Sequence, residues 1–281
     1  MKLSELLPLT AIRIKFKLLT LLNKRKAAES AFELFCTPLD KAPIRRPSVF
    51  NNSEALRFNF NGNKIRGYIW NLDKPHTILI LHGFGSAAYK FHRYVSLLIA
   101  KGYRVIAVDA PAHGSSEGET VNALEYSELI QFIAQKYGPI DGYLAHSFGG
   151  IALSLALEQI PHSAHNKMVL IAPATETTTA IDLAFKMLHL NNSKVKKEFY
   201  KIIEQKSGHP VEWFSIKRAM QQIQAQVLWV HDELDDITPF KDAVAVKTLA
   251  YPNIEFLFTN GLGHRKIYHD QAVKDKVVDF L

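Results

Sequence analysis

One serine stands in a sequence pattern that suits a catalytic nucleophile. Ser147 lies in the run Ala145-His146-Ser147-Phe148-Gly149-Gly150, between an apolar stretch at 142–145 and a helix-prone stretch of small and apolar residues at 151–157. Where a strand turns sharply into a helix, a serine is held in a strained backbone conformation, and small flanking residues let the two elements approach closely. Once a base removes its proton, such a hydroxyl can attack a carbonyl carbon. We therefore predict that Ser147 is a nucleophile.

The base and the acid that a serine nucleophile requires are both available later in the chain. An apolar strand is predicted at 227–230, and three carboxylates follow it: Asp232, Asp235 and Asp236. A second predicted strand at 255–258 precedes His264 in a loop that contains glycine, and His269 follows at the start of the last predicted helix. We expect the base to be His264, because it lies in the loop after a strand. The position after a strand alone does not choose among the three carboxylates.

The elements that would position these residues alternate between strands and helices. Asn61-Gly62-Asn63 separates two apolar, strand-prone runs at 56–60 and 64–70, which predicts a hairpin. Further strands are predicted at 77–81, 104–108, 142–145, 168–171, 227–230 and 255–258, and helices at 89–101, 122–137, 149–159, 240–249 and 272–281. Continuous apolar strands separated by helices predict an α/β fold with a mostly parallel sheet and helices on both faces.

The alternation is interrupted once, between 173 and 227, where only helical stretches at 180–190 and 194–206 are evident. We predict an N-terminal basic amphipathic helical segment at 1–46, a core in two parts at 47–174 and 223–281, and a helical cap inserted at 175–222. Open α/β sheets bind ligands at the carboxyl edge of their strands. A cap in this place would cover that edge.

These motifs resemble the α/β-hydrolase superfamily, in its capped branch of esterases and of lysophospholipase-like and monoglyceride-lipase-like enzymes. The resemblance covers roughly 55–175 and 225–281. In that family the acid precedes a Val/Thr-Pro pair, as Asp235 precedes Thr238-Pro239, and the histidine ends a Gly-x-Gly-His motif, as in Gly261-Leu262-Gly263-His264. The resemblance therefore implies the catalytic triad Ser147, Asp235 and His264. Ala145 stands where the family has glycine.

The resemblance also implies which groups would bind the oxyanion of a tetrahedral intermediate. One donor would be the backbone N–H of Phe148, and the other that of Phe84 in the loop His82-Gly83-Phe84-Gly85, where His82, Gly83 and Gly85 support the donor. Each such donor is worth about a hundredfold to a thousandfold in rate. The turn at 109–116 is similar to the Asp-x-Pro-Gly-His-Gly-x-Ser turn of the family, with Ala112 in place of a glycine, and is expected to be structural.

The expected activity is that of a carboxylesterase- or lipase-like serine hydrolase, which cleaves an ester of a small or lipid-derived molecule through an acyl-enzyme and needs no cofactor. The same triad would also support hydrolysis of a thioester or of a carbon–carbon bond. A fold that binds a ligand without catalysis is a third alternative, and reaction of Ser147 with a fluorophosphonate would exclude it.

A dinucleotide-binding function fits one segment taken alone. Gly83-Phe84-Gly85 and Ala88 match a Gly-x-Gly-x-x-Ala pattern between a strand and a helix, and Asp109 ends the next strand. This alternative explains neither His82, nor the preceding hairpin, nor the three triad residues. No His-Glu-x-x-His motif, cysteine pair or acidic calcium loop indicates a metal site, and no phosphate-binding loop of the Gly-x-x-x-x-Gly-Lys-Ser/Thr type is present.

The charge distribution separates the N-terminal segment from the rest of the chain. The formal net charge is +7, and residues 1–46 carry +6 of it, with ten Lys and Arg against four Asp and Glu. The remaining residues carry only +1, so we expect no nucleic-acid binding. The single cysteine, Cys36, excludes an intrachain disulfide and fits a reducing, cytoplasmic location.

The N-terminal segment contains a predicted basic amphipathic helix but no apolar run long enough to span a bilayer. Arg13, Lys17, Thr20 and Lys24 fall on one face, and Lys15 intrudes on an otherwise apolar remainder: Ile12, Ile14, Phe16, Leu18, Leu19, Leu21 and Leu22. We expect this helix to pack against its own domain. The alternative is that it lies on an anionic membrane surface as a peripheral contact.

Overall fold

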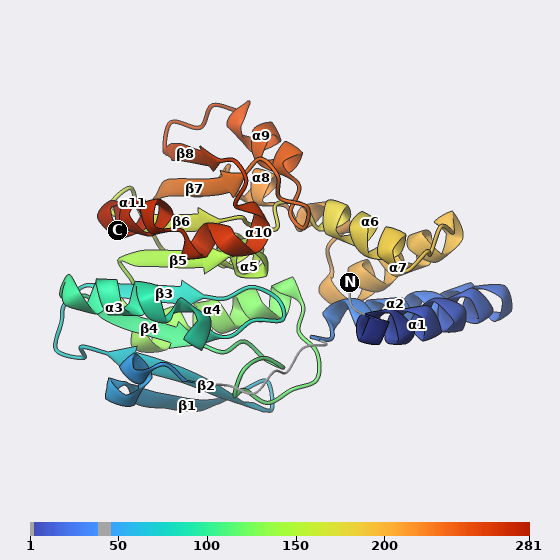
Figure 1. Cartoon of the computed structure of the whole chain (residues 1–281), viewed down its shortest axis with the longest axis horizontal. Helices are drawn as coiled ribbons and strands as arrows, with labels where there is room; N and C mark the ends of the chain where they lie inside the picture. Colours follow the sequence, from blue (N-terminus) through green and yellow to red (C-terminus); the bar gives the residue numbers. More distant parts are fainter. Residues whose placement is uncertain (1–2, 39–45) are drawn as a thin grey trace. The chain divides into compact units, whose positions relative to one another are not determined.

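The computed structural model describes residues 3–38 and 46–281, and for residues 3–9 it describes the backbone alone. Residues 39–45 of the predicted N-terminal segment lie outside the described residues. The chain divides into two compact units (Figure 1). Unit 1 comprises Met1–Thr37 and Glu176–Phe214, and unit 2 comprises Pro38–Thr175 and Ser215–Leu281.

Unit 2 is built on one sheet, which contains eight strands within the described residues. Their order across the sheet is β1-β2-β4-β3-β5-β6-β7-β8. The strands are β1 (Glu54–Phe60), β2 (Asn63–Trp70), β3 (Thr77–Leu81), β4 (Arg104–Val108), β5 (Gly142–His146), β6 (Lys167–Ile171), β7 (Gln226–Asp232) and β8 (Ile254–Thr259). All neighbouring pairs from β4 to β8 are parallel, and the pairs β1–β2 and β2–β4 are antiparallel. The predicted α/β-hydrolase sheet is therefore confirmed.

The hairpin of β1 and β2 forms where the sequence predicts it. Asn61 and Gly62 both have positive φ angles, 47° and 80°, which a two-residue turn between twisted strands requires and which asparagine and glycine tolerate. Phe60 pairs with Asn63 across the turn. The hairpin adds the two antiparallel strands to one edge of the parallel sheet, because β2 pairs with β4.

Helices cover both faces of this sheet. Figure 1 shows α3 and α11 in front of the strands and α4 and α5 behind them. The α-helices of unit 2 are α3 (His92–Ala100), α4 (Ala123–Tyr137), α5 (Phe148–Leu157), α8 (Ile216–Ala219), α9 (Phe240–Lys247), α10 (Gly263–Lys266) and α11 (Gln271–Phe280). Its 3₁₀ helices are η1 (Ser48–Asn52), η2 (Ala88–Phe91) and η4 (Ile267–His269). In front, Leu98 of α3 and Val277 of α11 pack with Ile80 and Val105 of the strands in a fully buried cluster.

Unit 1 consists of helices that pack through small and aromatic side chains. They are α1 (Leu3–Leu22), α2 (Lys24–Cys36), α6 (Thr177–Met187), α7 (Ser193–Ser207) and the 3₁₀ helix η3 (Val211–Trp213). The ring of Phe199 on α7 lies 5.7 Å from that of Phe32 and 5.8 Å from that of Phe35, both on α2. Phe185 of α6 contacts the same ring edge-on at 5.3 Å. Phe199 therefore joins α2, α6 and α7 in one small core.

This grouping differs from the division expected from the sequence. The N-terminal helices and the inserted helices belong to one unit, although 139 positions separate the end of the first segment at Thr37 from Glu176, where the second begins. The second segment of the unit ends at Phe214, and the short helix α8 that follows contacts α5 of unit 2. Amphipathic helices show which face is apolar but not which other helix will cover it. None of the described helices is long and apolar enough to cross a membrane.

Candidate active site

The carboxyl ends of four strands, β3, β5, β7 and β8, bring the predicted site residues to one edge of the sheet. His82 follows β3, Ser147 follows β5, Asp235 follows β7 and His264 follows β8. These strands are parallel and lie in the order β3-β5-β6-β7-β8. Their carboxyl ends therefore point the same way, toward the edge at which open α/β sheets place their ligands.

The turn at Ser147 has the strained backbone that the sequence pattern predicts. Ser147 has φ 54° and ψ −120°, a backbone conformation that residues other than glycine rarely adopt. The helix α5 then passes so close to β3 that a Cβ added at Gly149 would lie 2.7 Å from the carbonyl oxygen of His82 and 2.9 Å from that of Leu81. This close approach explains the glycine at 149, while Ala145 is accommodated fully buried.

The side chains of Ser147, His264 and Asp235 form one hydrogen-bonded chain. The Oγ of Ser147 lies 3.0 Å from Nε2 of His264, and Nδ1 of His264 lies 2.8 Å from Oδ2 of Asp235. All three residues are buried, with between 7 and 9% of their surface exposed. With the proton of the imidazole on Nδ1, the ring donates to Asp235 and Nε2 is left to accept the proton of Ser147.

The backbone around Asp235 holds its carboxylate in the ionised form. Oδ1 accepts hydrogen bonds from the N–H groups of Ile237 (2.9 Å) and Thr238 (2.8 Å), and Oδ2 accepts one from the hydroxyl of Thr238 (2.8 Å). Burial alone would raise the pKa of Asp235, but the hydrogen bond and charge of His264 and the two backbone donors lower the pKa below its ordinary value. The carboxylate is thus a permanent acceptor for His264.

The two neighbouring carboxylates lie elsewhere. Asp232 is buried at the end of β7, where Oδ2 accepts from the hydroxyl of Thr259 (2.7 Å) and from the N–H of Leu262 (2.9 Å). It therefore ties the loop after β7 to the loop after β8, which carries His264. Asp236 is exposed to solvent. The competing histidine, His269, is exposed at the end of η4.

The loop after β3 lies directly against the turn at Ser147. A Cβ added at Gly83 would meet the Cβ of Ser147 at 2.9 Å, and the ring of Phe84 packs edge-on against the ring of Phe148 at 5.4 Å. Phe148 is the first residue of α5, and the first N–H groups of a helix have no carbonyl partner within it. The two residues expected to supply oxyanion donors are thus neighbours on one side of Ser147.

Two histidines fix the shape of this loop. Nε2 of His82 accepts from the N–H of Ala110 (3.0 Å), which leaves the proton on Nδ1 to be donated to the carbonyl of Gly83 (2.8 Å). Nε2 of His113 accepts from the N–H of Gly85 (2.9 Å). Burial lowers the pKa of His82 to about 4, so the ring is neutral in the form that these contacts require.

Asp109, the acid that a dinucleotide-binding function would require, is buried and bound by backbone N–H groups of its own protein. Its Oδ1 accepts from the N–H of Ala88 (2.8 Å) and its Oδ2 from the N–H of Ser115 (2.9 Å), and the residue is almost wholly buried. Both oxygens therefore tie the turn at 109–116 to the start of η2. Gly83 permits the close contact with Ser147, and Gly85 adopts a positive φ angle of 66° in the same loop.

Two further residues around the triad, His146 and His231, were not predicted from the sequence. Nε2 of His146 donates to the backbone carbonyl of His264 (3.2 Å), and its ring lies 4.8 Å from the ring of His264. His231 donates through Nε2 to the carbonyl of Thr238 (2.7 Å), and so holds the residue that positions Asp235. Burial lowers the pKa of His146 to about 3, so it supports the catalytic histidine as a neutral ring. The position of His146 next to the nucleophile was the one signal that could have identified it.

The neutral buried histidines predict that the fold weakens in mild acid. A histidine with an ordinary pKa near 6.5 in the unfolded chain takes up a proton there before His82 or His146 does in the folded protein. The two histidines should therefore leave the free energy of unfolding unchanged above pH 7. As the pH falls below 7 that free energy should decrease, and at pH 5 each of the two should have lowered it by about 2 kcal/mol. Urea unfolding at pH 7 and pH 5 measures this loss. Equal stability at the two pH values would contradict the account, and a His82→Gln variant should show a smaller loss.

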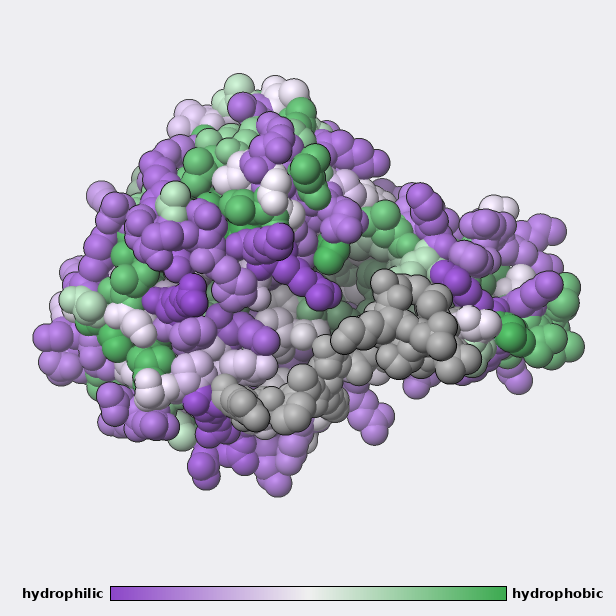
Figure 2. Space-filling model, viewed as in Figure 1, coloured by the Kyte–Doolittle hydropathy of each residue, from purple (hydrophilic) through white to green (hydrophobic). Residues whose placement is uncertain are grey.

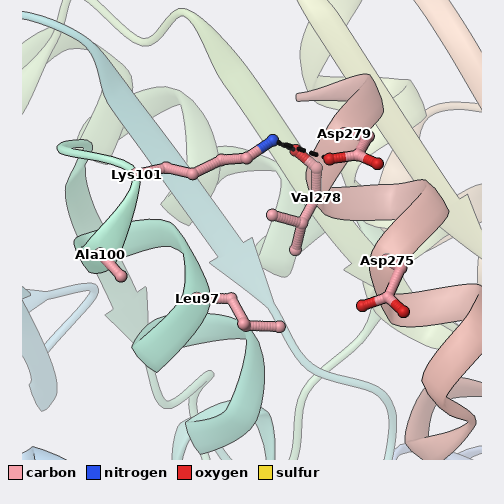
Figure 3. Close-up of a pocket in the computed structure, with 6 residues that line it drawn as sticks. All are labelled: Leu97, Ala100, Lys101, Asp275, Val278 and Asp279. Carbon is pink, nitrogen blue, oxygen red and sulfur yellow. Dashed lines mark hydrogen bonds and ion pairs between the residues drawn. The ribbon is translucent and has the colours of Figure 1, made fainter.

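A shallow hollow on unit 2 lies between α3 and α11 and carries no comparable chemistry. Figure 3 shows Lys101 reaching across it to the carbonyl of Val278 (2.7 Å) and to the carboxylate of Asp279 (3.1 Å). Its lining residues are Leu97, Ala100, Lys101, Asp275, Val278 and Asp279. These contacts fasten the C-terminal helix to the sheet's front layer. Among the described residues, no group of three or more His, Cys, Asp and Glu side chains could hold a metal ion.

The sheet agrees with the comparison to known proteins. Residues 78–252 match the alpha/beta hydrolase family, and the chain therefore belongs to that family. A Mycoplasma genitalium protein named "Putative esterase/lipase 2" is 25% identical over 243 residues, which cover 74% of this chain and 90% of that protein. Its namesake from Mycoplasma pneumoniae is 30% identical over 112 residues, 38% of this chain and only 41% of the relative.

Solved structures share the fold. An esterase from Pyrococcus furiosus superposes with a TM-score of 0.65 at 17% sequence identity, over 88% of this chain and 97% of the esterase. The α/β-hydrolase fold predicted from the sequence is thus confirmed, and the named relatives are hydrolases of the esterase and lipase type. The narrower placement in the capped lysophospholipase-like branch stays a prediction.

Proposed function

We propose that this protein hydrolyses carboxylic esters through an acyl-enzyme on Ser147. The observation that carries the proposal is the continuous chain from Ser147 Oγ through both nitrogens of His264 to Asp235, at 3.0 and 2.8 Å. Hydrogen-bond distances of this kind between a nucleophile, a base and an orienting acid are the geometry that nucleophilic catalysis needs.

In the acylation step, Nε2 of His264 removes the proton of Ser147 while Oγ forms a bond to the ester carbonyl carbon. The carbonyl oxygen becomes an oxyanion, and the backbone N–H groups of Phe84 and Phe148 would stabilise it. Asp235 stabilises the positive charge that forms on the imidazole. When the intermediate collapses, the bond to the alcohol oxygen breaks and His264 protonates the departing alcohol.

Deacylation repeats these roles with water. His264 takes a proton from water, the resulting hydroxide attacks the acyl carbon, and the bond to Ser147 Oγ breaks as that oxygen recovers its proton. The products are a carboxylic acid and an alcohol. Every proton passes between groups of this chain, substrate and water, so the scheme needs no cofactor.

Residues on the loops of the site favour a substrate with an apolar acyl or alcohol group. Phe84 on the oxyanion loop, and Leu234 and Ile237 on the loop that carries Asp235, are large apolar side chains exposed to solvent. Exposed apolar side chains on the loops that carry a reaction centre favour a ligand with apolar groups that can cover them. We therefore propose a substrate with a hydrocarbon chain, as in a lipid-derived ester.

A panel of p-nitrophenyl esters tests this substrate class. We expect kcat/KM to rise from acetate to octanoate, since each buried methylene adds about 0.8 kcal/mol. In the Leu234→Ser/Ile237→Ser variant, kcat/KM for octanoate should fall about tenfold or more, while that for acetate stays nearly unchanged.

Leu249→Ser is the matched control, because Leu249 is also exposed but follows α9, at the opposite end of the strands. A higher kcat/KM for acetate than for octanoate would contradict the proposed hydrocarbon substrate but not the proposed esterase activity. Absence of turnover with every ester, in a folded protein, would overturn the proposed function itself.

A further inference from the structure

The first helix of unit 1 has one face that contacts the unit and another that does not. Phe16 is 2% exposed, and the guanidinium of Arg13 donates to the carbonyl of Met187 at 2.8 Å. At 3.6 residues per turn, these two residues lie on the same side of α1. This side of α1 packs against the inserted helices. The sequence led us to expect that the helix packs against its own domain, and this holds for one side of α1 only.

The opposite side of α1 is apolar and uncovered. Ile14 and Leu18 are each 56% exposed, Leu21 is 78% exposed and Leu22 is 83% exposed. Their spacing of four, three and one residues places them in one stripe along the helix. Figure 2 shows hydrophobic atoms gathered at the end of the unit where α1 meets α2. We call these four residues the α1 stripe. Four large apolar side chains exposed to solvent along one face of a helix are unusual and indicate an interaction surface.

Lysines border the α1 stripe on both sides. Lys15 and Lys17 are exposed and fall on opposite edges of the stripe, and Lys24 and Lys26 are exposed just beyond its end. Unit 1 as a whole contains 13 Lys and Arg against 8 Asp and Glu, which is +5 of the net charge of +7. The surface thus combines an apolar centre with a cationic border.

We propose that the α1 stripe is a docking surface for an anionic lipid bilayer. A helix with this arrangement lies in the plane of the membrane interface, with its apolar side chains among the acyl chains and its lysines at the negative headgroups. This inference goes beyond the hydrolase site and does not depend on it. For the esterase, such docking would bring the protein to the surface where lipid-derived esters reside.

The charges favour a bilayer over a second copy of the chain. Pairing two α1 stripes face to face would bring the lysines that border one stripe close to those that border the other, and like charges disfavour such a contact. An anionic surface instead matches the apolar centre and the cationic border at once.

Vesicle flotation with the full-length protein tests the proposal. We expect binding to vesicles of phosphatidylcholine mixed with phosphatidylserine and much weaker binding to phosphatidylcholine alone. A Leu18→Gln/Leu21→Gln variant keeps the charge and the helix propensity, and should bind at least tenfold more weakly. Lys15→Gln/Lys17→Gln should also bind about tenfold more weakly.

Two controls separate this surface from other features. Leu72→Gln/Leu249→Gln changes two exposed leucines of unit 2 and should bind as the unchanged protein does. Ser147→Ala should bind equally well, which keeps the result independent of hydrolysis. Failure of the unchanged protein to bind anionic vesicles would overturn the proposal. So would sedimentation equilibrium showing a dimer that the Leu18→Gln/Leu21→Gln change dissociates, with no vesicle binding, since the stripe would then be a self-association surface.

Discussion

Replacing Ser147 by alanine should lower kcat for any ester substrate by about a thousandfold to a millionfold. The change removes the oxygen that lies 3.0 Å from Nε2 of His264 and leaves the base with nothing to deprotonate except water. Alanine keeps the Cβ that serine already carries at φ 54°, so the backbone strain of the turn is unchanged. Folding should therefore be preserved while the chemistry is lost.

Single-turnover and steady-state kinetics of Ser147→Ala measure this effect, with circular dichroism to verify the fold. Ser154→Ala is the matched control, because Ser154 is a buried serine on α5, the helix that follows Ser147, and its hydroxyl donates to the carbonyl of Gly150 at 2.9 Å. It should retain kcat within about threefold, since the change removes one neutral hydrogen bond far from the base. A Ser147→Ala protein with undiminished turnover would show that another residue is the nucleophile.

Replacing Asp235 by asparagine should lower kcat by about a thousandfold to ten-thousandfold, through the tautomer of His264. The N–H groups of Ile237 and Thr238 donate to Oδ1, so the oxygen of the new amide stays on that side. Its NH₂ group then faces Nδ1 of His264, which must become the acceptor. The proton of the ring moves to Nε2, and His264 can no longer accept the proton of Ser147.

The two neighbouring aspartates provide the comparison for Asp235→Asn. Asp236→Asn should leave kcat unchanged, because that side chain is exposed and outside the chain of hydrogen bonds. Asp232→Asn should lower stability by about 1–3 kcal/mol, because its carboxylate joins the loops after β7 and β8. If Asp236→Asn abolished activity while Asp235→Asn retained it, the choice of acid would be wrong.

The central strands and the residues at their ends could be predicted because both leave local marks in the sequence. Buried parallel strands are continuous apolar runs, and β3 and β4 begin and end at the predicted residues. A nucleophile on a strained turn needs small neighbours, which the glycines after Ser147 supply. The parallel arrangement then dictates that residues at the ends of β5, β7 and β8 meet, although they are far apart along the chain.

The contacts that support the triad could not be predicted, because they join groups without a sequence pattern. The ring of His146 reaches the backbone carbonyl of His264, and His231 reaches the carbonyl of Thr238. A carbonyl acceptor is present at every residue, so its partner leaves no signature. The association of the helices of unit 1 could not be predicted either, because no sequence pattern marks which apolar faces pack together. Phe199 is one of many apolar residues on an amphipathic face, and its contacts with α2 depend on the three-dimensional packing.

The exposed stripe on α1 shows that only part of the apolar side of this helix packs against the unit. Phe16 of the apolar side is buried, whereas Leu21 and Leu22 are exposed. On the polar face, Arg13 turns toward the unit while Lys17 is exposed. Arg13 can turn inward because its guanidinium donates to the carbonyl of Met187 through both Nε and Nη2. A sequence pattern shows that a helix has two faces, but it does not show which one a partner inside the protein satisfies.

Covalent labelling of Ser147 tests the central claim most directly. After incubation with a fluorophosphonate, intact-protein mass spectrometry should show one adduct per chain, and peptide mapping should place it on Ser147. The adduct should be absent from Ser147→Ala, which lacks the reacting oxygen. It should form far more slowly on Asp235→Asn, in which His264 can no longer accept the proton of Ser147. An unlabelled, folded protein, or an adduct on a different serine, would contradict the assignment of this site as the catalytic centre.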